Sequence, residues 1–490
     1  MSGVAGAAPG PSLEDARTLL IAGEWRPARD TFDRYDPARL DRQTGRYAAA
    51  RDEDVALAYV AAHEAQPGWA ATPAPARGEV LRRAADLLDG RHEEAAQRLT
   101  SDMGKAIKDA RGEVARSVAI LRYFAGELLQ PAGEVYASAD ADTTLMTVEQ
   151  PLGVVCAITP WNFPFAIPAW KLAPALAFGN AVVWKPAEAA SGSAVLLSEV
   201  LVAAGVPAGV LNLVTGSGGA LSRALTGDER LAALTFTGSG TVGTHLRQAV
   251  ADRNVKVQLE LGGKNPAIVL ADADLEDAAA QVARGAMLAT GQRCTATSRV
   301  YVERAVAERF RELLCERVLA LRVGDPREEK TDLGPLAFVE QRDTVSRYLR
   351  LAVEENVEVL TGGTVEDDTC FAAPTVLSGV ARDSALMREE IFGPVVVIEP
   401  VEDFEAALDA ANDTEFGLSS ALFTRDLAKA MRFIRETESG LVHVNRETAG
   451  AEPHVPFGGV KASSSMSREQ GKAAREFFTT TKTVYLRARG

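Results

Sequence analysis

The spacing of apolar residues before position 131 is that of amphipathic helices. Apolar side chains recur every three or four residues in 53–65, 77–99 and 112–129, which places them on one face of a helix. Residues 131–150 are more polar and end in a β-prone run of threonine, leucine, methionine and valine. The pattern predicts three helices followed by a hairpin that leaves the first domain.

From Gly153 onward, short apolar runs alternate with helical segments. The first series contains predicted strands at 154–158, 181–184, 210–214 and 231–236, with helices at 168–178 and 191–204. A second series after Gly262 contains a helix from Leu275 and strands at 266–270, 299–302, 395–400, 421–423 and 442–445. Such alternation is typical of βαβ units, so we predict an α/β fold with parallel sheets. A last β-prone run, 477–486, is expected to join the 131–150 hairpin in a sheet extension between subunits.

The composition argues against several classes of partner. The chain has 490 residues, 53 of them basic and 67 acidic, for a formal charge of −14, whereas nucleic acids and anionic membranes select clustered cations. The longest apolar run, 172–184, is too short to cross a bilayer. The N-terminus lacks the basic and apolar regions of a secretion signal. We therefore expect no nucleic acid, no membrane and no secretion.

The cysteines, at positions 156, 294, 315 and 370, are too scattered for a zinc site, and the five histidines form no ligand cluster. No metal site is predicted, and a reducing, cytoplasmic location is expected. Cys156 lies in a predicted strand and Cys315 in a helical run, so both are expected in the core. Cys370 is expected in an exposed loop with no base motif near it.

Cys294 is the strongest candidate for a reactive group. Its neighbours Gln292, Arg293 and Thr295 are polar or cationic, a setting that favours the thiolate. Glu260, in the sequence ELGGK, is a distant carboxylate. A thiolate that attacks a carbonyl and a carboxylate that then activates water would together give covalent catalysis followed by hydrolysis. A buried inert thiol is the alternative, since that is the common fate of a single cysteine.

The segment from Gly238 to Gly243 has the spacing G-x-G-x-x-G and lies between the strand at 231–236 and a predicted helix at 245–251. In that context backbone N–H groups at a helix N-terminus can face a pyrophosphate. An ordinary glycine turn has the same spacing, but both flanks favour dinucleotide binding. Lys185 and Glu188, at the end of an earlier strand, are the predicted ribose clamp, in preference to Glu260.

Two further turns carry candidate groups. Asn162, in the turn TPWNFP, can donate its amide to a developing oxyanion, although an asparagine that caps the next helix would give the same pattern. In the turn EEIFGP, a carboxylate can hold ribose hydroxyls and Phe392 can pack on a nicotinamide. A solvated helix end is the alternative for this second turn.

Taken in order, the segments TPWNFP, KPAE, FTGS, ELGGK, GQRCT, EEIFGP and PFGGVK resemble the NAD(P)-dependent aldehyde dehydrogenase superfamily. The resemblance covers nearly the whole chain. It implies an aldehyde dehydrogenase-like α/β fold with a Rossmann-type dinucleotide-binding domain (18–130 and 151–261), an α/β catalytic domain (262–445) and a small β oligomerisation sheet (131–150 and 475–488). Homodimers or homotetramers are expected.

The resemblance also implies a mechanism. Cys294 would form a thiohemiacetal with the aldehyde, while Asn162 and the backbone N–H of Cys294 hold the oxyanion. Hydride transfer to the nicotinamide leaves a thioester, and Glu260 activates the water that hydrolyses it. Lys171 matches a lysine that assists proton relay in the family.

NAD is the expected cofactor, and NADP is possible. Glu188 suits the ribose hydroxyls of NAD and repels a 2′-phosphate, whereas Lys185 can help to accept one. From the glycine motif and the resemblance together, the residues expected to contact the cofactor are Ile158, Thr159, Trp161, Lys185, Glu188, Gly238, Ser239, Gly243, Leu261, Glu390 and Phe392.

The C-terminal sequence HVPFGG, followed by paired serines and REQG, looks like that of the α-ketoglutaric semialdehyde dehydrogenase group, although Ala462 stands where relatives usually have glycine. The resemblance implies oxidation of α-ketoglutaric semialdehyde (2,5-dioxopentanoate) to 2-oxoglutarate. Succinic semialdehyde or a broad range of aldehydes are alternatives. A CoA-acylating enzyme, a catalytically silent scaffold and a cysteine esterase are alternatives of other kinds, and the presence of both Cys294 and Glu260 argues against the first two.

An anionic aldehyde needs a cation in the substrate tunnel. Arg293, beside the nucleophile, and Arg116, on the helix at 112–129, are the candidates. A surface position for Arg116 is equally open, and the string QRCT around Arg293 also occurs in relatives with other substrates. The other residues expected around the substrate are Phe165, Trp170, Thr295 and Phe457.

Overall fold

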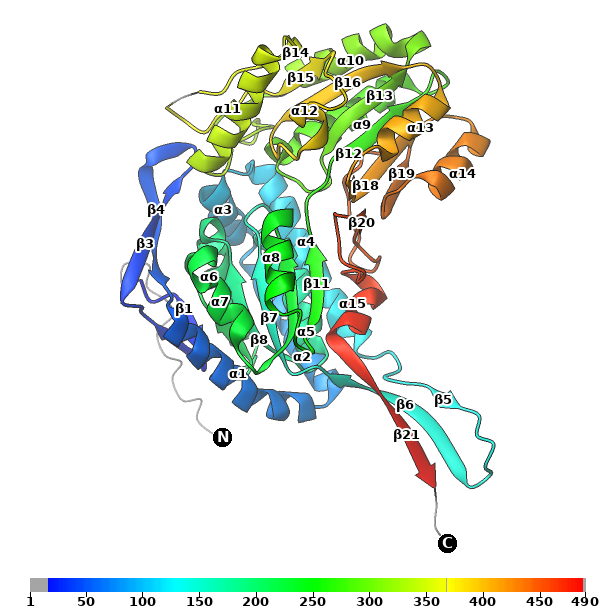
Figure 1. Cartoon of the computed structure of the whole chain (residues 1–490). Coiled ribbons are helices and arrows are strands. Elements are labelled where there is room, and N and C mark those ends of the chain that lie inside the picture. Colours follow the sequence, from blue (N-terminus) through cyan, green and yellow to red (C-terminus); the bar gives the residue numbers. More distant parts are fainter. Residues whose placement is uncertain (1–15, 367, 488–490) are drawn as a thin grey trace.

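The computed structural model describes residues 16–366 and 368–487, which form two sheet-containing bodies and a projecting arm (Figure 1). The first body is built on a seven-stranded sheet in the order β11-β10-β7-β8-β9-β1-β2. Neighbouring strands from β11 to β9 are parallel, and β1 joins β9 antiparallel. The strands are β1 (Leu19–Ile21), β2 (Glu24–Arg26), β7 (Val154–Thr159), β8 (Ala181–Pro186), β9 (Leu211–Leu213), β10 (Leu231–Thr237) and β11 (Lys256–Glu260). The four strands predicted for this series are confirmed.

Helices cover both faces of this sheet, which explains why its inner strand β7 is apolar at nearly every position. Val155 and Ala157 of β7 pack into a cluster with α2 to α6, whereas Val154 and Cys156 pack into a cluster with α1, α7 and α8. Successive strand residues point to opposite faces, so a doubly covered strand needs apolar residues at every position. The helices are α1 (Asp52–Ala71), α2 (Ala74–Gly90), α3 (His92–Met103), α4 (Ile107–Glu127), α5 (Ala166–Ala177), α6 (Ser191–Ala203), α7 (Gly218–Gly227) and α8 (Gly240–Ala249).

One predicted helix is wrong in extent. The segment 77–99 is not continuous, because the chain breaks at Arg91 (φ −105°, ψ 22°) between α2 and α3. Apolar periodicity continues through the break since both helices bury a face in the same core. The helices predicted at 53–65 and 112–129 are confirmed as parts of α1 and α4.

The second body contains another seven-stranded sheet, in the order β14-β15-β16-β13-β12-β18-β19, parallel except between β14 and β15. All five strands predicted for the second series are present, as is the helix from Leu275. The sequence pattern did not predict the helices α11 to α14 or the strands β14 and β15. The elements are β12 (Asn265–Val269), β13 (Thr297–Glu303), β14 (Glu358–Thr361), β15 (Thr375–Ser378), β16 (Val395–Val401), β18 (Ser419–Phe423), β19 (Leu441–Val444), α9 (Leu275–Met287), α10 (Ala307–Leu319), α11 (Val339–Glu354), α12 (Ala385–Arg388), α13 (Phe404–Asn412) and α14 (Leu427–Glu436).

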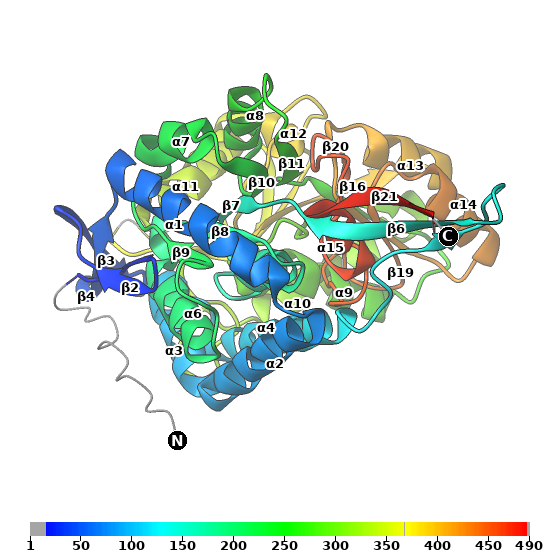
Figure 2. The ribbon, with the colours of Figure 1, turned by 90° about the horizontal axis from the view of Figure 1, so that it is seen from below.

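The arm is a three-stranded sheet of β5 (Val135–Tyr136), β6 (Thr143–Pro151) and β21 (Thr479–Arg487). β6 and β21 pair antiparallel from Thr479 opposite Pro151 to Arg487 opposite Thr143. Figure 1 shows them extending away from the two bodies, and Figure 2 shows the same two strands side by side from below. The tail strand was predicted to begin at Phe477. Phe477 and Phe478 instead end the helix α15 (Gly471–Phe478) and are buried, so the strand starts at Thr479.

Two short antiparallel pairs complete the described structure: β3 (Asp30–Asp36) with β4 (Arg39–Ala49), and β17 (Phe416–Gly417) with β20 (Val460–Lys461). Among the described residues, no helix is both long and apolar enough to cross a membrane. The domain division at 130/131, 150/151 and 261/262 stays a proposal, supported by the assignment of the two large sheets to separate stretches of the chain. Residue 488, the last of the proposed oligomerisation sheet, and the first 15 residues of the N-terminus lie outside the described residues.

Candidate active site

Cys294 lies where two cavities meet. One has a volume of about 220 Å³ and the other about 380 Å³, and Cys294 lines both. Residues that follow the carboxyl ends of β7, β10 and β11 enclose the smaller cavity, at the edge where ligands bind in open parallel sheets. The predicted nucleophile is therefore accessible from two directions.

Six of the predicted cofactor residues line the smaller cavity: Trp161, Gly238, Ser239, Leu261, Glu390 and Phe392. The Trp161 ring packs edge-on against Phe392, with 5.4 Å between ring centroids, and against Phe338 at 5.1 Å. Phe392 has φ 56°, a left-handed conformation that costs a non-glycine residue about 1–2 kcal/mol. Local strain of this kind is held by the surrounding structure and clusters at ligand sites.

Glu390 stands at the wall of the smaller cavity because Gly262 has no side chain. A Cβ on Gly262 would lie only 2.3 Å from Glu390 Oε2. The other oxygen, Oε1, accepts the N–H of Gly263 at 3.0 Å. Burial raises the pKa of Glu390 to about 7. The carboxyl is thus placed beside the backbone of the sequence ELGGK, where a ligand can reach both.

Four of the other predicted cofactor residues lie at the carboxyl ends of β7 and β8, outside the smaller cavity. Ile158 pairs with Lys185 in the sheet, and the hydroxyl of Thr159 accepts the indole N–H of Trp184 at 2.9 Å. Burial lowers the pKa of Lys185 to about 8, against the opposing charge of Glu188. These residues form a second group along the same sheet edge.

Gly243 has a packing role. It is buried in α8, and a Cβ there would lie 2.6 Å from Leu261 Cδ2. The helix also begins at Gly240 rather than near His245, with Ser239 as its N-cap residue. The last glycine of the G-x-G-x-x-G motif therefore permits close packing of α8 on the strand end, and the first residues of the motif line the cavity.

The backbone before Cys294 adopts a tight and unusual turn. Ala289, Thr290 and Gly291 all have φ between 53° and 65°. A Cβ on Gly291 would lie 2.1 Å from the carbonyl oxygen of Gly393, so only glycine fits at this position. Asn265 Nδ2 donates to the carbonyl of Cys294 at 2.8 Å. Both contacts fix the position of the nucleophile's backbone.

Asn162 is buried beside Cys294 in the smaller cavity. Its Nδ2 donates one hydrogen bond, to the carbonyl of Gln292 at 3.1 Å, and an amide NH₂ has a second hydrogen to offer. The N-cap residue of α5 is Phe165, and no side-chain hydrogen bond caps that helix. The helix-cap alternative for Asn162 is therefore excluded.

The prediction that the residues around Cys294 favour its thiolate form is wrong for the protein in this structure. Burial raises the pKa of the Cys294 thiol to about 12, and the carboxylates of Glu390, Glu260 and Glu469 act in the same direction. Arg293, the expected source of positive charge, turns its guanidinium to the carbonyls of Arg284 (2.5 Å) and Gly285 (2.9 Å). The positive charge of the adjacent Arg293 therefore does not offset the effect of burial and of the three carboxylates on the pKa of the thiol.

Glu260 is buried at the end of β11, with its Oε2 accepting the hydroxyl of Ser464 at 2.6 Å. Burial raises its pKa well above the usual range, and the nearby carboxyl of Glu469 adds to this effect. Lys171 forms a fully buried ion pair with Glu469 and also donates to Thr235 Oγ1 at 2.8 Å. The predicted base therefore belongs to a buried group of two carboxyls and one ammonium.

The larger cavity is lined by more cations than anions. Its lysines and arginines number five against three carboxylates, and its lining includes Arg116, Trp170, Arg293, Thr295 and Phe457 of the predicted substrate residues. Trp170 and Phe457 stack with 5.6 Å between ring centroids. Phe165 is not among the lining residues and is fully buried in the core with α4 and α5. Phe165 is therefore not among the proposed substrate contacts.

Arg116 differs from the other cations of the larger cavity. The unpredicted cations Lys105, Lys108 and Arg284 each have a carboxylate within 4.0 Å, in Glu113, Asp332 and Glu447, and Arg293 lies 3.7 Å from Glu447. Arg116 is half-buried and, within the part of the chain that the structure describes, has no such partner. Its charge is therefore available to a ligand.

A comparison with protein-family models matches residues 25–484 to the aldehyde dehydrogenase family. The chain belongs to this family. It is 43% identical over 475 residues to an alpha-ketoglutaric semialdehyde dehydrogenase of Bacillus subtilis (strain 168), covering 96% of this chain and 97% of the relative. It is 41% identical over 481 residues to an alpha-ketoglutarate semialdehyde dehydrogenase of Haloferax volcanii, covering 96% and 99%.

The fold of this aldehyde dehydrogenase agrees with solved structures. The crystal structure of an NAD-dependent aldehyde dehydrogenase from Sinorhizobium meliloti superposes with a TM-score of 0.94 at 34% sequence identity, covering 97% of this chain and 96% of the other. The predicted aldehyde dehydrogenase-like α/β fold is confirmed, and the protein is an oxidoreductase.

Three groups in the site of this aldehyde dehydrogenase were missed by sequence reasoning. Glu469 lies in REQG and Ser464 in the serine run after PFGGVK, and neither residue was predicted to have a role in the site. The buried pair of Lys105 and Glu113 was not noticed: Lys105 donates to the carbonyl of Asn162 at 2.8 Å, and Glu113 accepts the N–H of Phe165 at 2.9 Å. No pattern distinguishes this pair in the sequence, because Lys105 precedes α4 and Glu113 lies in a stretch with several other charged residues.

The remaining cysteines of the aldehyde dehydrogenase are remote from the two cavities. Cys156 is buried in the core, as predicted. Cys315 is half-buried on α10, where it packs against the core of the second body. The prediction that Cys370 is exposed is wrong, because its side chain is fully buried against α11 and β15.

Proposed function

We propose that this aldehyde dehydrogenase oxidises α-ketoglutaric semialdehyde (2,5-dioxopentanoate) to 2-oxoglutarate. The supporting observation is the half-buried Arg116 without a carboxylate partner among the described residues, in a cavity that ends at Cys294. A guanidinium pairs well with a carboxylate, and the proposed substrate carries one at the end opposite its aldehyde. The names of both curated relatives agree with this substrate.

We propose that the smaller cavity holds the nicotinamide end of NAD, with NADP as a second possibility. The glycines support this: a Cβ on Gly238 would lie 2.4 Å from the Phe236 ring, and Gly262 leaves the Glu390 carboxyl uncovered. Glu390 and Phe392 are placed for ribose and ring contacts, and Lys185 and Glu188 for the adenosine ribose. When bound, the cofactor would accept the hydride of the aldehyde carbon.

In this proposal Cys294 Sγ, as thiolate, forms a bond to the aldehyde carbon, and Asn162 Nδ2 and the Cys294 N–H donate to the resulting oxyanion. After oxidation the acyl group remains on Sγ as a thioester. Glu260 then takes a proton from water, whose oxygen bonds to the acyl carbon. The C–S bond breaks and restores the Cys294 thiolate, and the acid product releases its remaining proton to solvent as it leaves as the carboxylate. The buried ion pair of Lys171 and Glu469 lies beside Glu260 and provides further proton-binding groups there.

Arg116→Leu is expected to raise KM for α-ketoglutaric semialdehyde by about 10- to 100-fold, because a charged hydrogen bond contributes about 1.5–3 kcal/mol. KM for propanal, which has no carboxylate, is expected to stay unchanged. The measurement is a panel of aldehydes with NAD and with NADP, read by the absorbance of the reduced cofactor. Succinic semialdehyde, which also has one carboxylate, is the competing substrate in the panel.

Arg122→Leu is the matched control, because Arg122 lies on the same helix and forms exposed ion pairs with Asp86 and Asp89, which contribute little. Equal changes in KM for charged and uncharged aldehydes would contradict the role of Arg116. A higher kcat/KM for succinic semialdehyde or for propanal in the unmodified enzyme would contradict the proposed substrate.

We further propose that the arm mediates self-association into dimers or tetramers. Its strands expose apolar side chains, with 77% of Val135, 72% of Tyr485 and 58% of Leu486 accessible in one chain, and such patches mark interaction surfaces. Light scattering is expected to give at least the dimer mass, and a monomer mass would contradict the proposal. A reducing compartment such as the cytoplasm is proposed because the reaction needs Cys294 as a free thiol.

A further inference from the structure

The two oxygens of the Glu260 carboxyl have different surroundings. Oε2 accepts the hydroxyl of Ser464 at 2.6 Å. Oε1 is buried and, among the residues that the structure describes, has no hydrogen-bond partner. It lies beside Gly458, where a Cβ would come within 2.8 Å of it. One oxygen is thus held and the other is available to a water molecule.

The hydroxyl of Ser464 has a defined direction. Ser464 Oγ accepts the backbone N–H of Gly459 at 2.6 Å, and Glu260 and Ser464 also pair through an isolated antiparallel bridge. A serine hydroxyl has one proton and two acceptor sites. With one acceptor site occupied by Gly459, the proton can go to Glu260, and the second acceptor site can receive a proton from it.

A third cavity, of about 480 Å³, reaches Ser464, the hydrogen-bond partner of Glu260. Ser464 is half-buried and is one of its lining residues, together with Thr244 and Arg247 of α8 and Glu415. Cys294 is absent from this lining. Ser464 therefore connects the buried carboxyl of Glu260 to a polar chamber that Cys294 does not line, although the chamber shares Leu261, Gly262 and Glu390 with the smaller cavity.

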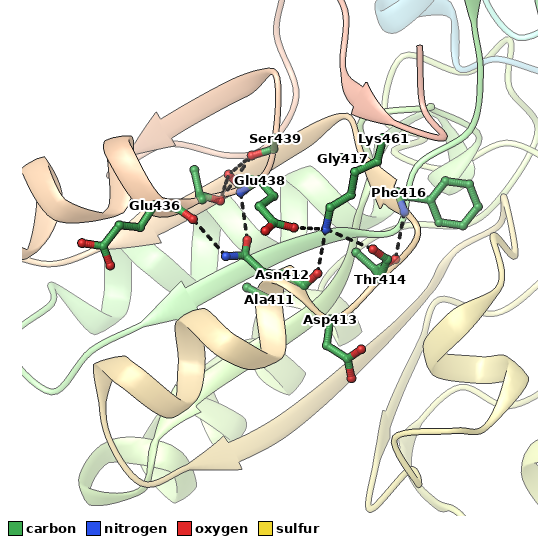
Figure 3. Close-up of polar contacts among 12 residues, drawn as sticks. Ala411, Asn412, Asp413, Thr414, Phe416, Gly417, Glu436, Glu438, Ser439 and Lys461 are labelled. Atoms are coloured by element: carbon green, nitrogen blue, oxygen red, sulfur yellow. Dashed lines mark hydrogen bonds and ion pairs between the residues drawn. The ribbon is translucent and has the colours of Figure 1, made fainter. Parts of the chain in front are cut away.

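The segment that carries Ser464 is anchored to the second body. Figure 3 shows Lys461 Nζ donating to the carbonyls of Asn412 (2.8 Å) and Thr414 (3.1 Å) and forming an ion pair with Glu438. Asn412 in turn accepts the N–H of Glu438 at 2.9 Å. These contacts hold Lys461, three residues before Ser464, against the second body.

We propose that Ser464 is a positioning residue that connects Glu260 to the third cavity and passes to water there the proton released in thioester hydrolysis. The inference rests on the proposed function. Glu260 Oε1 receives a proton from the attacking water, whose oxygen bonds to the acyl carbon. The carboxyl then turns about its Cγ–Cδ bond, so that the protonated oxygen faces Ser464. It gives that proton to Ser464 Oγ, while the Ser464 hydroxyl proton moves to a water molecule in the chamber.

The charged groups around Glu260 set the background for this transfer. Glu469, in the segment before α15, raises the pKa of Glu260, whereas Lys171 of α5 and Arg468 lower it, and the Ser464 hydrogen bond also lowers it. The Cys294 thiol faces the same carboxyl. Loss of the Ser464 hydroxyl leaves the other groups in place and removes one contact that stabilises the ionised form.

Ser464→Ala is expected to slow steady-state turnover about tenfold, the change that corresponds to the loss of one hydrogen bond to a charged group. The rapid first burst of reduced cofactor is expected to keep its rate and its amplitude of one per active site, because the burst precedes hydrolysis. The pH at which turnover is half-maximal is expected to move upward, since the ionised form of Glu260 loses a hydrogen bond. Stopped-flow absorbance across a pH series measures all three quantities.

Ser464→Thr keeps the hydroxyl and is expected to restore both turnover and the pH profile. Ser465→Ala is the matched control, because Ser465 lines the same chamber but accepts the N–H of Leu259 instead of contacting Glu260. Unchanged turnover and pH profile in Ser464→Ala would overturn the inference, as would equal losses in burst and turnover that threonine does not restore. The absence of any burst in the unmodified enzyme would instead count against the proposed function.

Discussion

Cys294→Ser is expected to lower kcat/KM for every aldehyde oxidised by the enzyme by at least about 10³-fold, because a hydroxyl is a far weaker nucleophile than a thiolate and the covalent step depends on it. The side chains are nearly the same size, and the turn at Ala289 to Gly291 that positions residue 294 is set by the backbone. Reduced-cofactor absorbance in single-turnover experiments measures the loss directly.

Cys315→Ser is the matched control, because Cys315 is half-buried on α10 and lines neither of the cavities at Cys294. It is expected to keep full activity. Both variants are expected to have the thermal unfolding midpoint of the unmodified protein within a few degrees. Activity of Cys294→Ser within about tenfold of the unmodified enzyme would contradict covalent catalysis at this residue.

Glu260→Gln is expected to separate the two halves of the reaction. Turnover is expected to fall by about 10²–10⁴-fold, the usual contribution of a general base. One equivalent of reduced cofactor per active site is expected to form before turnover stops, because the acyl group stays on Cys294. A burst measurement, with mass spectrometry to detect the acylated chain, distinguishes this outcome from a loss of binding.

The pH dependence of hydrolysis gives the same residue a second test. Glu260 acts in its ionised form, and burial beside Glu469 raises its pKa. The active form is therefore lost as pH falls, and the loss begins at higher pH than for an exposed glutamate. Turnover of the unmodified enzyme is expected to decline as the pH falls through this raised pKa. The pH profile of Glu260→Gln is expected to lack this decline on the acid side. An unshifted acid limb in both proteins would contradict the assignment of the base.

The charge around Cys294 was the least predictable property of the site. The neighbours in sequence suggested a cationic setting, yet the thiol faces Glu260, Glu390 and Glu469. These three carboxyls come from segments far apart in the chain and reach the thiol only through the packing of the two bodies. The Arg293 guanidinium donates to two carbonyls of α9, and no local sequence pattern predicts these contacts.

The sequence alone determined where the buried strands lie along the chain and which turns between them carry the reactive residues. Doubly covered strands require apolar residues at every position, so β7, β8, β10, β12 and β16 were visible as apolar runs. Short turns with fixed residues, such as those around Asn162, Cys294 and Glu390, carried the nucleophile, the base and the cofactor contacts. Burial of a strand on both faces and the geometry of a short turn each restrict consecutive residues, so a single sequence shows them.

Only the tertiary structure decided which distant groups share a space. It placed Arg116 without a partner among the described residues in the larger cavity, Phe165 in the core, and Ser464 against Glu260. It also broke the helical run of 77–99 at Arg91. Burial, ion pairing and the direction of a side chain depend on what packs against it, and those neighbours lie tens to hundreds of residues away in the chain.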